Sequence, residues 1–448
     1  MKILILADQR QRLKSQINLV EQLIKYDFKL EVTFIVACEN IESDFKKILN
    51  YNNIKIIYII RQKNNLSNKS SVSKKSKINL LIKHTTIGQI SYSFVLAIKM
   101  FSYLRIAEKY ITIIKPDILL VNSDRRGVSL EQAFLKMSKK YVIRSIIPYT
   151  SVISNGISLR LASFNCYSIQ TMLDKILFKI LKNQTKNING NIIKFYDSST
   201  TIILKLFGLL SLNPWMIGNG LVDYVCVDNL FSFNKYKSDI LFPEKFKIVG
   251  DIEYDILYQQ SSFQKKILNT NYTINNDLPN IIISLPQLAE HFILDWEQHW
   301  KEIYFLLDEL KDIHANIFVS LHPKMDLNKY VHLEKKYSYI ILKEQLRDVI
   351  HESDLFIAIN SSTVLWSTIL GIKTIMLDYF ELDSSFFRNL SSIQFIKDKK
   401  SFKNVVVNSL VSKVNFNDDF KILSKDDIFD GNTIKRYLEL IKEGEISE

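Results

Sequence analysis

Short apolar runs of strand length alternate with longer stretches of helical periodicity in the first half of the chain. Residues 2–7 form the first apolar run, and residues 11–26 then repeat apolar positions at helical spacing. The same pattern predicts further strands at residues 31–38, 55–60, 117–121, 142–147 and 223–227. Because these runs lack polar alternation, they are typical of strands buried on both faces, and they predict a parallel, doubly wound α/β sheet.

A second alternating series occupies the C-terminal part of the chain. It predicts strands at residues 280–285, 315–321, 339–342, 354–359 and 373–377, with helices between them. We therefore expect a Rossmann-like domain over residues 1–235, a second one over residues 236–430, and a helical tail over residues 431–448. Two such α/β domains would face a central cleft, with ligands at the carboxyl ends of the strands.

Length and composition fit this two-domain interpretation. The chain has 448 residues, of which 47% are hydrophobic and 24% charged, as in an ordinary globular protein with room for two cores. The cysteines Cys38, Cys166 and Cys226 have neither metal-ligand nor redox spacing, so a reduced, cytoplasmic location is expected. The first apolar run is too short for a signal peptide, and lysines interrupt the long apolar stretches, so no transmembrane helix is expected.

Charge is divided unevenly along the chain. Residues 1–250 carry 37 Lys and Arg against 17 Asp and Glu, whereas residues 251–448 carry 22 against 30. No acidic residue occurs between Tyr51 and Met100. This division indicates two domains with different partners, and the basic domain would attract an anionic glycan, lipid or nucleic acid. Because no DNA- or RNA-binding motif accompanies the basic half, nucleic acid is not the expected partner.

A strict helical stripe of apolar residues lies within the basic half. Its members are Ile169, Met172, Leu173, Ile176, Leu177, Ile180 and Leu181. Lys175, Lys179 and Lys182 flank the stripe. Such a stripe is typical of a helix packed on a core, which is the interpretation we favour; the alternative is a basic amphipathic helix lying on a membrane.

A histidine stands at the end of one predicted strand of the second domain. His322 and Pro323 directly follow the strand at residues 315–321. Proline stops the strand and fixes the turn, and a histidine at this place can donate a hydrogen bond to a phosphate or a leaving group. A lone histidine is commonly structural, but a second polar strand end favours a functional role here.

The second polar strand end follows residues 354–359. The turn there consists of Asn360, Ser361, Ser362 and Thr363, and a predicted helix starts within it. Free N–H groups and the positive end of the helix dipole attract anions at such a position. One hydroxyl is enough for an N-cap, so three in succession favour contact with a phosphate.

Two further sets of polar residues follow predicted strands. Gln287 and Glu290 come after the strand at residues 280–285 and are candidates for contact with a nucleotide or sugar, the alternative being a solvated loop. Asp124, Arg125 and Arg126 come after the strand at residues 117–121.

Asp124 would be placed as a general base for an acceptor hydroxyl, and the two arginines could bind an acidic acceptor. The equally weighted alternative is that Asp124 pairs with these arginines and caps the next helix. Asp8, at the end of the first strand, is the competing base.

The sequence contains no glycine-rich dinucleotide motif, no P-loop and no cluster of acids that resembles a two-metal site. We therefore expect neither a bound cofactor nor a catalytic metal, and a nucleotide sugar would be a substrate.

At these positions the sequence resembles GT-B-fold glycosyltransferases, and most narrowly the bacterial surface-polysaccharide enzymes that carry an HP motif and a later SS motif. His322-Pro323 and Ser361-Ser362-Thr363 carry the resemblance, which covers about residues 280–378. Sialyltransferases and Kdo (3-deoxy-manno-octulosonate) transferases share this pair of motifs. The resemblance implies that the C-terminal domain binds the nucleotide-activated donor, that the N-terminal domain binds the acceptor, and that His322 and the three hydroxyls contact the donor phosphate. The family's acidic catalytic motif has no match here.

The resemblance implies a metal-independent glycosyltransferase that moves a sugar, with CMP-linked donors as one candidate class, to a growing glycan or glycolipid of the capsule, O-antigen or lipooligosaccharide type. The enzyme would be cytoplasmic or peripheral at the inner face of the cytoplasmic membrane. Two alternatives stay open. Ser123-Asp124-Arg125 resembles a segment of UDP-N-acetylglucosamine 2-epimerases, although residues 142–156 lack the acids that those enzymes need. The other alternative is a non-enzymatic basic protein that binds nucleic acid or lipid.

Overall fold

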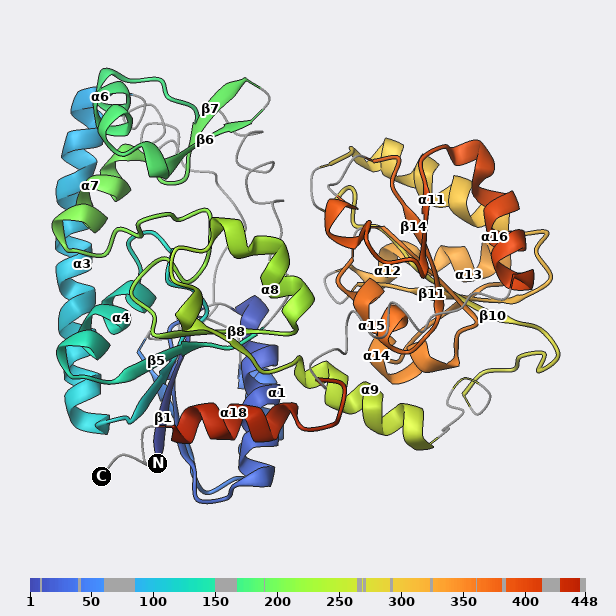
Figure 1. Cartoon of the computed structure of the whole chain (residues 1–448), viewed down its shortest axis with the longest axis horizontal. Helices are drawn as coiled ribbons and strands as arrows, with labels where there is room; N and C mark the ends of the chain where they lie inside the picture. Colours follow the sequence, from blue (N-terminus) through green and yellow to red (C-terminus); the bar gives the residue numbers. More distant parts are fainter. Residues whose placement is uncertain are drawn as a thin grey trace, which may run out of the picture. The chain divides into compact units, whose positions relative to one another are not determined.

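The computed structural model describes most of the chain, and it divides the chain into two compact units. The described residues are 1–8, 10–38, 42–59, 85–149, 167–188, 190–263, 268, 271–290, 293–322, 325–359, 361–380, 384–412 and 428–443. Unit 1 comprises Met1–Asp228, Ser232–Val249 and Ile434–Glu448, and unit 2 comprises Asn229–Phe231 and Gly250–Thr433 (Figure 1).

Unit 1 is built on a seven-stranded parallel sheet in the order β3-β2-β1-β4-β5-β8-β9. The strands are β1 (Lys2–Ala7), β2 (Glu31–Val36), β3 (Ile54–Tyr58), β4 (Ile118–Leu120), β5 (Arg144–Ile147), β8 (Tyr224–Val227) and β9 (Phe246–Ile248). Every β1 residue after Lys2 is buried, as expected for a central strand covered by helices on both faces. The chain order reverses between the neighbours β1 and β4, where ligands of doubly wound sheets bind.

Helices and one hairpin complete unit 1. The helices are α1 (Arg10–Tyr26), α3 (Thr86–Ile114), α4 (Leu130–Lys140), α6 (Met172–Ile180), α7 (Ser198–Leu206), α8 (Leu230–Tyr236) and α18 (Thr433–Lys442), and the antiparallel hairpin pairs β6 (Thr185–Ile188) with β7 (Asn191–Lys194). Local sequence sets several starts: Thr85 caps α3, Ser129 caps α4, and Thr171 with Asp174 forms a capping box on α6.

Unit 2 is built on a six-stranded parallel sheet in the order β12-β11-β10-β13-β14-β15. Its strands are β10 (Asn280–Ser284), β11 (Asn316–Ser320), β12 (Ile340–Ile341), β13 (Leu355–Ala358), β14 (Lys373–Leu377) and β15 (Ile393–Ile396). Its helices are α9 (Ile252–Phe263), α11 (Trp296–Leu310), α12 (Leu327–Tyr330), α13 (His332–Tyr337), α14 (Leu346–Val349), α15 (Thr363–Ile369) and α16 (Phe402–Val411). Both predicted Rossmann-like α/β domains are therefore confirmed.

Short 3-10 helices connect several of these elements. They span Glu42–Lys47, Lys182–Gln184, Lys237–Asp239, Pro243–Lys245, Ile350–Glu352, Ser384–Phe387 and Lys399–Ser401.

The boundary between the units differs from the expected one at residues 235 and 236. Unit 1 continues to Val249, because β9 pairs with β8 and extends the first sheet. The C-terminal helix α18 is not a separate tail, because it packs on unit 1. The Arg144 guanidinium donates to the Leu440 carbonyl at 3.1 Å, and Lys442 pairs with Asp27 at 2.6 Å.

Two helices of unit 1 depart from the sequence expectation. None of the seven apolar stripe residues at 169–181 is buried; α6 instead buries Asp174 and Phe178. Ile169, Leu173, Leu177 and Leu181 are half-buried, whereas Met172, Ile176 and Ile180 are exposed, so the stripe is not the fully packed core face that we favoured. In the described part of the chain, α3 is long and apolar enough to cross a membrane by length and composition alone. This differs from the expectation of no such helix, because Lys99 is a single charge in a long apolar stretch.

Candidate functional site

Three of the predicted polar segments meet along one edge of the unit 2 sheet. His322 follows β11, Gln287 and Glu290 follow β10, and Ser361 precedes α15 just after β13. These three strands are direct neighbours and run parallel, so their carboxyl ends share one edge. The ends of β11 and β13 lie two strand spacings apart, roughly 10 Å. The reversal of chain order between β10 and β13 marks this edge as the expected ligand position of a doubly wound sheet.

The loop after β10 holds buried polar atoms that face no partner. Gln287 Nε2 and Glu290 Oε2 are both buried, and neither has a hydrogen-bond partner among the described residues. The other Glu290 oxygen accepts a hydrogen bond from the Tyr330 hydroxyl at 2.8 Å. Buried polar groups are nearly always paired in folded proteins, so this loop has capacity to bind a polar ligand.

A buried aromatic relay fixes the orientation of Glu290. The Tyr330 hydroxyl lies 2.9 Å from Nε2 of His299, a fully buried residue of α11. Burial lowers the pKa of His299, while the nearby Glu290 acts in the opposite direction. Because the single hydroxyl proton of Tyr330 is donated to Glu290, the N–H at Nε2 of a neutral His299 donates to the tyrosine oxygen, and this chain of hydrogen bonds holds the Glu290 carboxylate in one position.

His322 is exposed at the edge and stands in a tight turn. The Met325 amide donates to the His322 carbonyl at 2.8 Å, and the His322 amide contacts the Met325 sulfur at 3.3 Å. The His322 backbone is therefore held to Met325, while the His322 side chain is exposed. Pro323 lies outside the described residues, and so does Asn360 of the second turn.

The hydroxyls after β13 interact with one another. Ser361 Oγ and Thr363 Oγ1 are 2.8 Å apart, and Ser361 Oγ accepts the Thr363 amide at 3.3 Å. Ser362, at the N-cap position, makes no side-chain capping bond. The helix α15 has only seven residues, so its dipole is short. The hydroxyls would therefore contribute more to anion binding, relative to the helix dipole, than the sequence pattern suggested.

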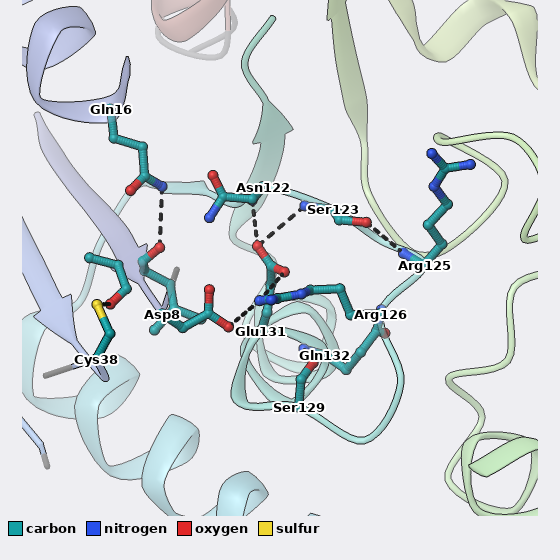
Figure 2. Close-up of polar contacts among 12 residues, drawn as sticks. Asp8, Gln16, Cys38, Asn122, Ser123, Arg125, Arg126, Ser129, Glu131 and Gln132 are labelled. Carbon is teal, nitrogen blue, oxygen red and sulfur yellow. Dashed lines mark hydrogen bonds and ion pairs between the residues drawn. The ribbon is translucent and has the colours of Figure 1, made fainter. Parts of the chain in front are cut away.

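A second polar cluster lies at the carboxyl edge of the unit 1 sheet. Arg126 bridges two carboxylates: its Nη1 donates to Asp8 Oδ2 and lies 3.2 Å from Glu131 Oε2 (Figure 2). The other Glu131 oxygen accepts the backbone amides of Asn122 and Ser123, the latter at 3.2 Å. The cluster therefore joins the ends of the neighbouring strands β1 and β4 to the first turn of α4.

Asp124 does not lie at an accessible strand end. Its side chain is 1% exposed, and its two oxygens accept the amides of Gly218 at 3.1 Å and Gly220 at 2.7 Å. A Cβ atom on Gly220 would lie 2.6 Å from the Asp124 carbonyl, so the approach requires glycine. Burial raises the pKa of Asp124, against the lowering effect of these amides. Asp124 anchors a loop, and neither sequence interpretation of it, as base or as partner of the arginines, fits this geometry.

Arg125 and Arg126 point in different directions and have different partners (Figure 2). The Arg125 guanidinium donates to the carbonyls of Pro214 at 3.2 Å and Trp215 at 2.7 Å. It thereby holds the same loop as Asp124, which conflicts with the expectation that it binds an acceptor. Arg126 is partly exposed and neutralises Asp8 and Glu131, so of the two it is the one placed to meet a ligand.

Sequence patterns missed several residues that shape these edges. Glu131 and Gln132 belong to α4, and His299 and Tyr330 come from two separate helices, α11 and α12. Glu131 offered one signal in the sequence, because it is an acid in the first turn of a helix that Ser129 caps. In the described ranges no group of three or more His, Cys, Asp or Glu side chains is placed to hold a metal ion.

Neither a protein-family model nor a curated protein sequence matches the chain. Solved structures do match it over nearly its full length. UDP-N-acetylglucosamine 2-epimerase from Methanocaldococcus jannaschii, in complex with UDP-N-acetylglucosamine and UDP, is 12% identical, with a TM-score of 0.54 and coverage of 99% of this chain and 100% of that one. The corresponding enzyme from Neisseria meningitidis, bound to UDP-N-acetylglucosamine, is 12% identical, with a TM-score of 0.53 and the same coverage.

The calicheamicin glycosyltransferase CalG4 is similar to the same extent. It is 12% identical, with a TM-score of 0.55 and coverage of 100% of this chain and 99% of that one. These likenesses show the fold: the chain has the two-domain, Rossmann-like GT-B architecture that glycosyltransferases and 2-epimerases share.

Proposed function

We propose that this protein is a glycosyltransferase that uses a nucleotide-activated sugar as its donor. The observation that carries the proposal is the meeting of His322, Ser361, Thr363 and the Gln287–Glu290 loop on neighbouring parallel strands at the reversal point of the unit 2 sheet. The GT-B architecture supports it, because solved structures of this fold hold UDP and UDP-N-acetylglucosamine. The HP and SS motifs favour a CMP-linked donor as the first one to test.

In this proposal the edge of unit 2 stabilises the departing phosphate. The bond between the anomeric carbon and the phosphate oxygen breaks, and negative charge builds up on that oxygen. His322 would donate a hydrogen bond to it, and the hydroxyls of Ser361 and Thr363 would solvate the neighbouring phosphate oxygens. Gln287 Nε2 is a buried donor without a partner among the described residues, and it would bind a ligand oxygen.

Asp8 is the proposed general base in place of Asp124. It follows β1 at the reversal point of the unit 1 sheet and pairs with the partly exposed Arg126. The acceptor hydroxyl oxygen would form the new bond to the anomeric carbon while its proton passes to the Asp8 carboxylate. Arg126 would hold that carboxylate in place and bind an anionic acceptor.

The proposed acceptor is a growing surface glycan or glycolipid at the inner face of the cytoplasmic membrane. The support is the charge of residues 1–250, where basic residues exceed acidic ones by 20, and the absence of acids between Tyr51 and Met100. Such a surface attracts anionic lipids and acidic glycans.

The donor assignment is tested by ligand binding and turnover in a matched pair of histidine variants. We expect CMP-, UDP-, GDP- or CDP-linked ligands to raise the melting temperature of the full-length protein, because a ligand that binds the folded state stabilises it. We expect His322→Ala to lower transfer about a hundredfold without changing stability. His314, an exposed histidine just before the amino end of β11, is the control, and His314→Ala should retain full activity. Full activity in a folded His322→Ala variant contradicts the proposal.

The base assignment is tested by comparing Asp8→Asn with Asp124→Asn. Asp8→Asn should remove the acidic limb of the pH profile of kcat/KM and lower kcat about a hundredfold in a folded protein. Asp124→Asn should act mainly on stability, at about 2 kcal/mol, because one amide of the 218–220 loop loses its acceptor. An unchanged pH profile in Asp8→Asn rejects Asp8 as the base.

A UDP-N-acetylglucosamine 2-epimerase is the second candidate function, because the epimerase structures match the chain as well as CalG4 does. The two functions differ in their need for an acceptor. Incubation with UDP-N-acetylglucosamine alone, followed by proton NMR, separates them: an epimerase forms the 2-epimer, whereas a transferase leaves the sugar unchanged. Steeply salt-dependent DNA binding without affinity for any nucleotide sugar would instead indicate a nucleic-acid-binding protein.

A further inference from the structure

The helix α3 exposes many large apolar side chains for a helix on a soluble domain. Its first half buries Gly88, Gln89, Ser93, Leu96 and Met100, while Ile87, Ile90, Phe94, Val95, Ile98 and Phe101 are exposed. The side chains of Phe94 and Ile98 are 69% and 74% exposed. A surface helix ordinarily exposes a polar face, so a second, exposed apolar face needs a cause and a use.

The cause is a buried polar network that holds the inner face of α3. Gln89 Nε2 donates to Asp174 at 3.3 Å, and the Ser199 hydroxyl donates to the Gln89 carbonyl at 2.6 Å. Asp174 is fully buried and pairs with Lys194 at 2.8 Å. These bonds join α3 to α6, β7 and α7. If α3 turned its exposed apolar face inward, the polar groups of this network would be exposed or left without hydrogen-bond partners.

The neighbouring helix α6 also exposes an apolar face. It buries Asp174 and Phe178 and leaves Met172, Ile176 and Ile180 exposed at i, i+4 and i+8, which places them on one face. Figure 1 shows α6 beside the amino-terminal end of α3, and the Gln89–Asp174 bond joins the two helices. Two adjacent helices therefore both present large apolar side chains to solvent.

The charges around these faces have one sign. Lys99 on α3 and Lys175, Lys179 and Lys182 on or just after α6 are exposed, and the acid of α6 is buried in its ion pair. The first acid of α3, Glu108, comes about six turns into the helix and pairs with Lys140. A hollow of about 460 Å³ adjoins this region, and Ile180 and Lys182 line it.

We propose that the exposed faces of α3 and α6 form a docking surface for an anionic lipid bilayer, with both helices lying in the interface and their apolar side chains inserted. The exposed apolar residues would insert among the acyl chains of the bilayer, and the flanking lysines would contact its anionic headgroups. The helix α3 lies on the membrane in this arrangement, because its inner face packs on α4 and α7. The inference deepens the proposed function, since a membrane-bound acceptor would then lie beside unit 1.

The test measures flotation of the full-length protein with vesicles of phosphatidylcholine alone or with phosphatidylglycerol added. We expect binding only to the anionic vesicles, and Phe94→Gln with Ile98→Gln should weaken it roughly tenfold or more. Leu327→Gln with Val411→Gln, which changes two exposed apolar residues of unit 2, is the matched control and should bind as the unaltered protein does. Lys175→Gln with Lys179→Gln should weaken binding about fivefold for each lysine.

Other outcomes overturn the proposal. Equal vesicle binding by the Phe94→Gln, Ile98→Gln variant and its control would remove the role of α3. A dimer in sedimentation velocity that these α3 substitutions dissociate, without vesicle binding, would identify a second copy of the chain as the occupant. The thermal shift with nucleotide sugars, measured on the same variants, reports folding and donor binding separately from lipid, so failure of the docking surface leaves the proposed activity open to its own test.

Discussion

The carboxyl edges of the two sheets share one topology but use their polar residues in different ways. In unit 1, Arg126 forms ion pairs with Asp8 and Glu131, and Asp124 accepts the amides of Gly218 and Gly220. In unit 2, Gln287 Nε2 and Glu290 Oε2 are buried without partners among the described residues, and His322 is exposed. Both edges keep buried amide atoms without partners among the described residues, Gln132 in unit 1 and Gln287 in unit 2, but the second edge also presents an exposed histidine.

The comparison shows that a polar strand end is not by itself a binding site. Asp124 and Arg125 stand at such an end, yet a loop distant in the sequence supplies partners for their polar atoms. Satisfied buried polar groups stabilise a structure, and unsatisfied ones cost free energy that a ligand can recover. Four predictions test this difference, from the largest expected effect to the smallest.

Glu131→Gln should destabilise unit 1 strongly. The side chain is fully buried, and the change removes the negative charge that Arg126 and two backbone amides contact. We expect the free energy of unfolding to fall by about 3 kcal/mol in urea denaturation. Glu297→Gln, at an exposed ion pair with Lys301, should change it by less than about 0.5 kcal/mol. Similar effects of the two changes would contradict the view that the unit 1 edge is a structural cluster.

Acid should destabilise unit 1 through Asp174. Burial opposes ionisation, but Lys194, Ser198 and two backbone amides outweigh it and lower the pKa of Asp174 to about 2. A lowered pKa means that its contribution is fully present above about pH 4 and is lost as the pH falls through about 2. The loss should be on the order of 2 kcal/mol, seen as faster hydrogen exchange in α6 and α7. In Asp174→Asn this pH dependence should disappear, and its persistence would assign it to other groups.

Removing the hydroxyls of the unit 2 edge should weaken nucleotide binding. Ser361→Ala with Thr363→Val deletes two groups that hydrogen-bond only to each other and to local backbone in the described structure. We expect Kd for the nucleotide ligand to rise about tenfold in calorimetry, with little change in stability. Ser412→Ala, at an exposed serine of the same unit, provides the control. An unchanged Kd would remove the turn from the donor site.

Two buried glutamines offer the most direct comparison of the edges. Gln287 in unit 2 and Gln132 in unit 1 both have buried amide atoms without partners among the described residues. Substitution by Met should leave stability unchanged or raise it by about 1 kcal/mol in both cases, because a buried unpaired amide is removed. Only Gln287→Met should also weaken nucleotide binding several-fold. A loss of binding in Gln132→Met alone would move the donor site to unit 1.

The sheets could be predicted from sequence because burial on both faces gives a local signal. The strands β1 and β14 start and end where their apolar runs do. The hairpin β6–β7 was missed because its strands are short and mixed in polarity. The end of unit 1 was misplaced because β9 has only three residues and gains its identity by pairing with β8.

A site residue could be predicted only where its residue type and its position at a strand end were sufficient to suggest ligand contact. His322, Ser361 and Thr363 stand at strand ends that the sequence itself marks. The roles expected for Asp124 and Arg125 depended on direction and burial, which distant residues decide. Their partners, Gly218, Gly220, Pro214 and Trp215, lie about ninety residues away in the chain.

The sequence by itself determined two doubly wound α/β sheets and the strand ends at which chemistry can occur, because hydrophobic periodicity and turn residues act over a few positions. Only the tertiary structure decided which polar groups form hydrogen bonds within the protein and which remain able to bind a ligand. It also decided that α3 and α6 expose large apolar side chains while burying Gln89 and Asp174. Both outcomes depend on hydrogen-bond partners that come together from distant parts of the chain, and no local pattern encodes them.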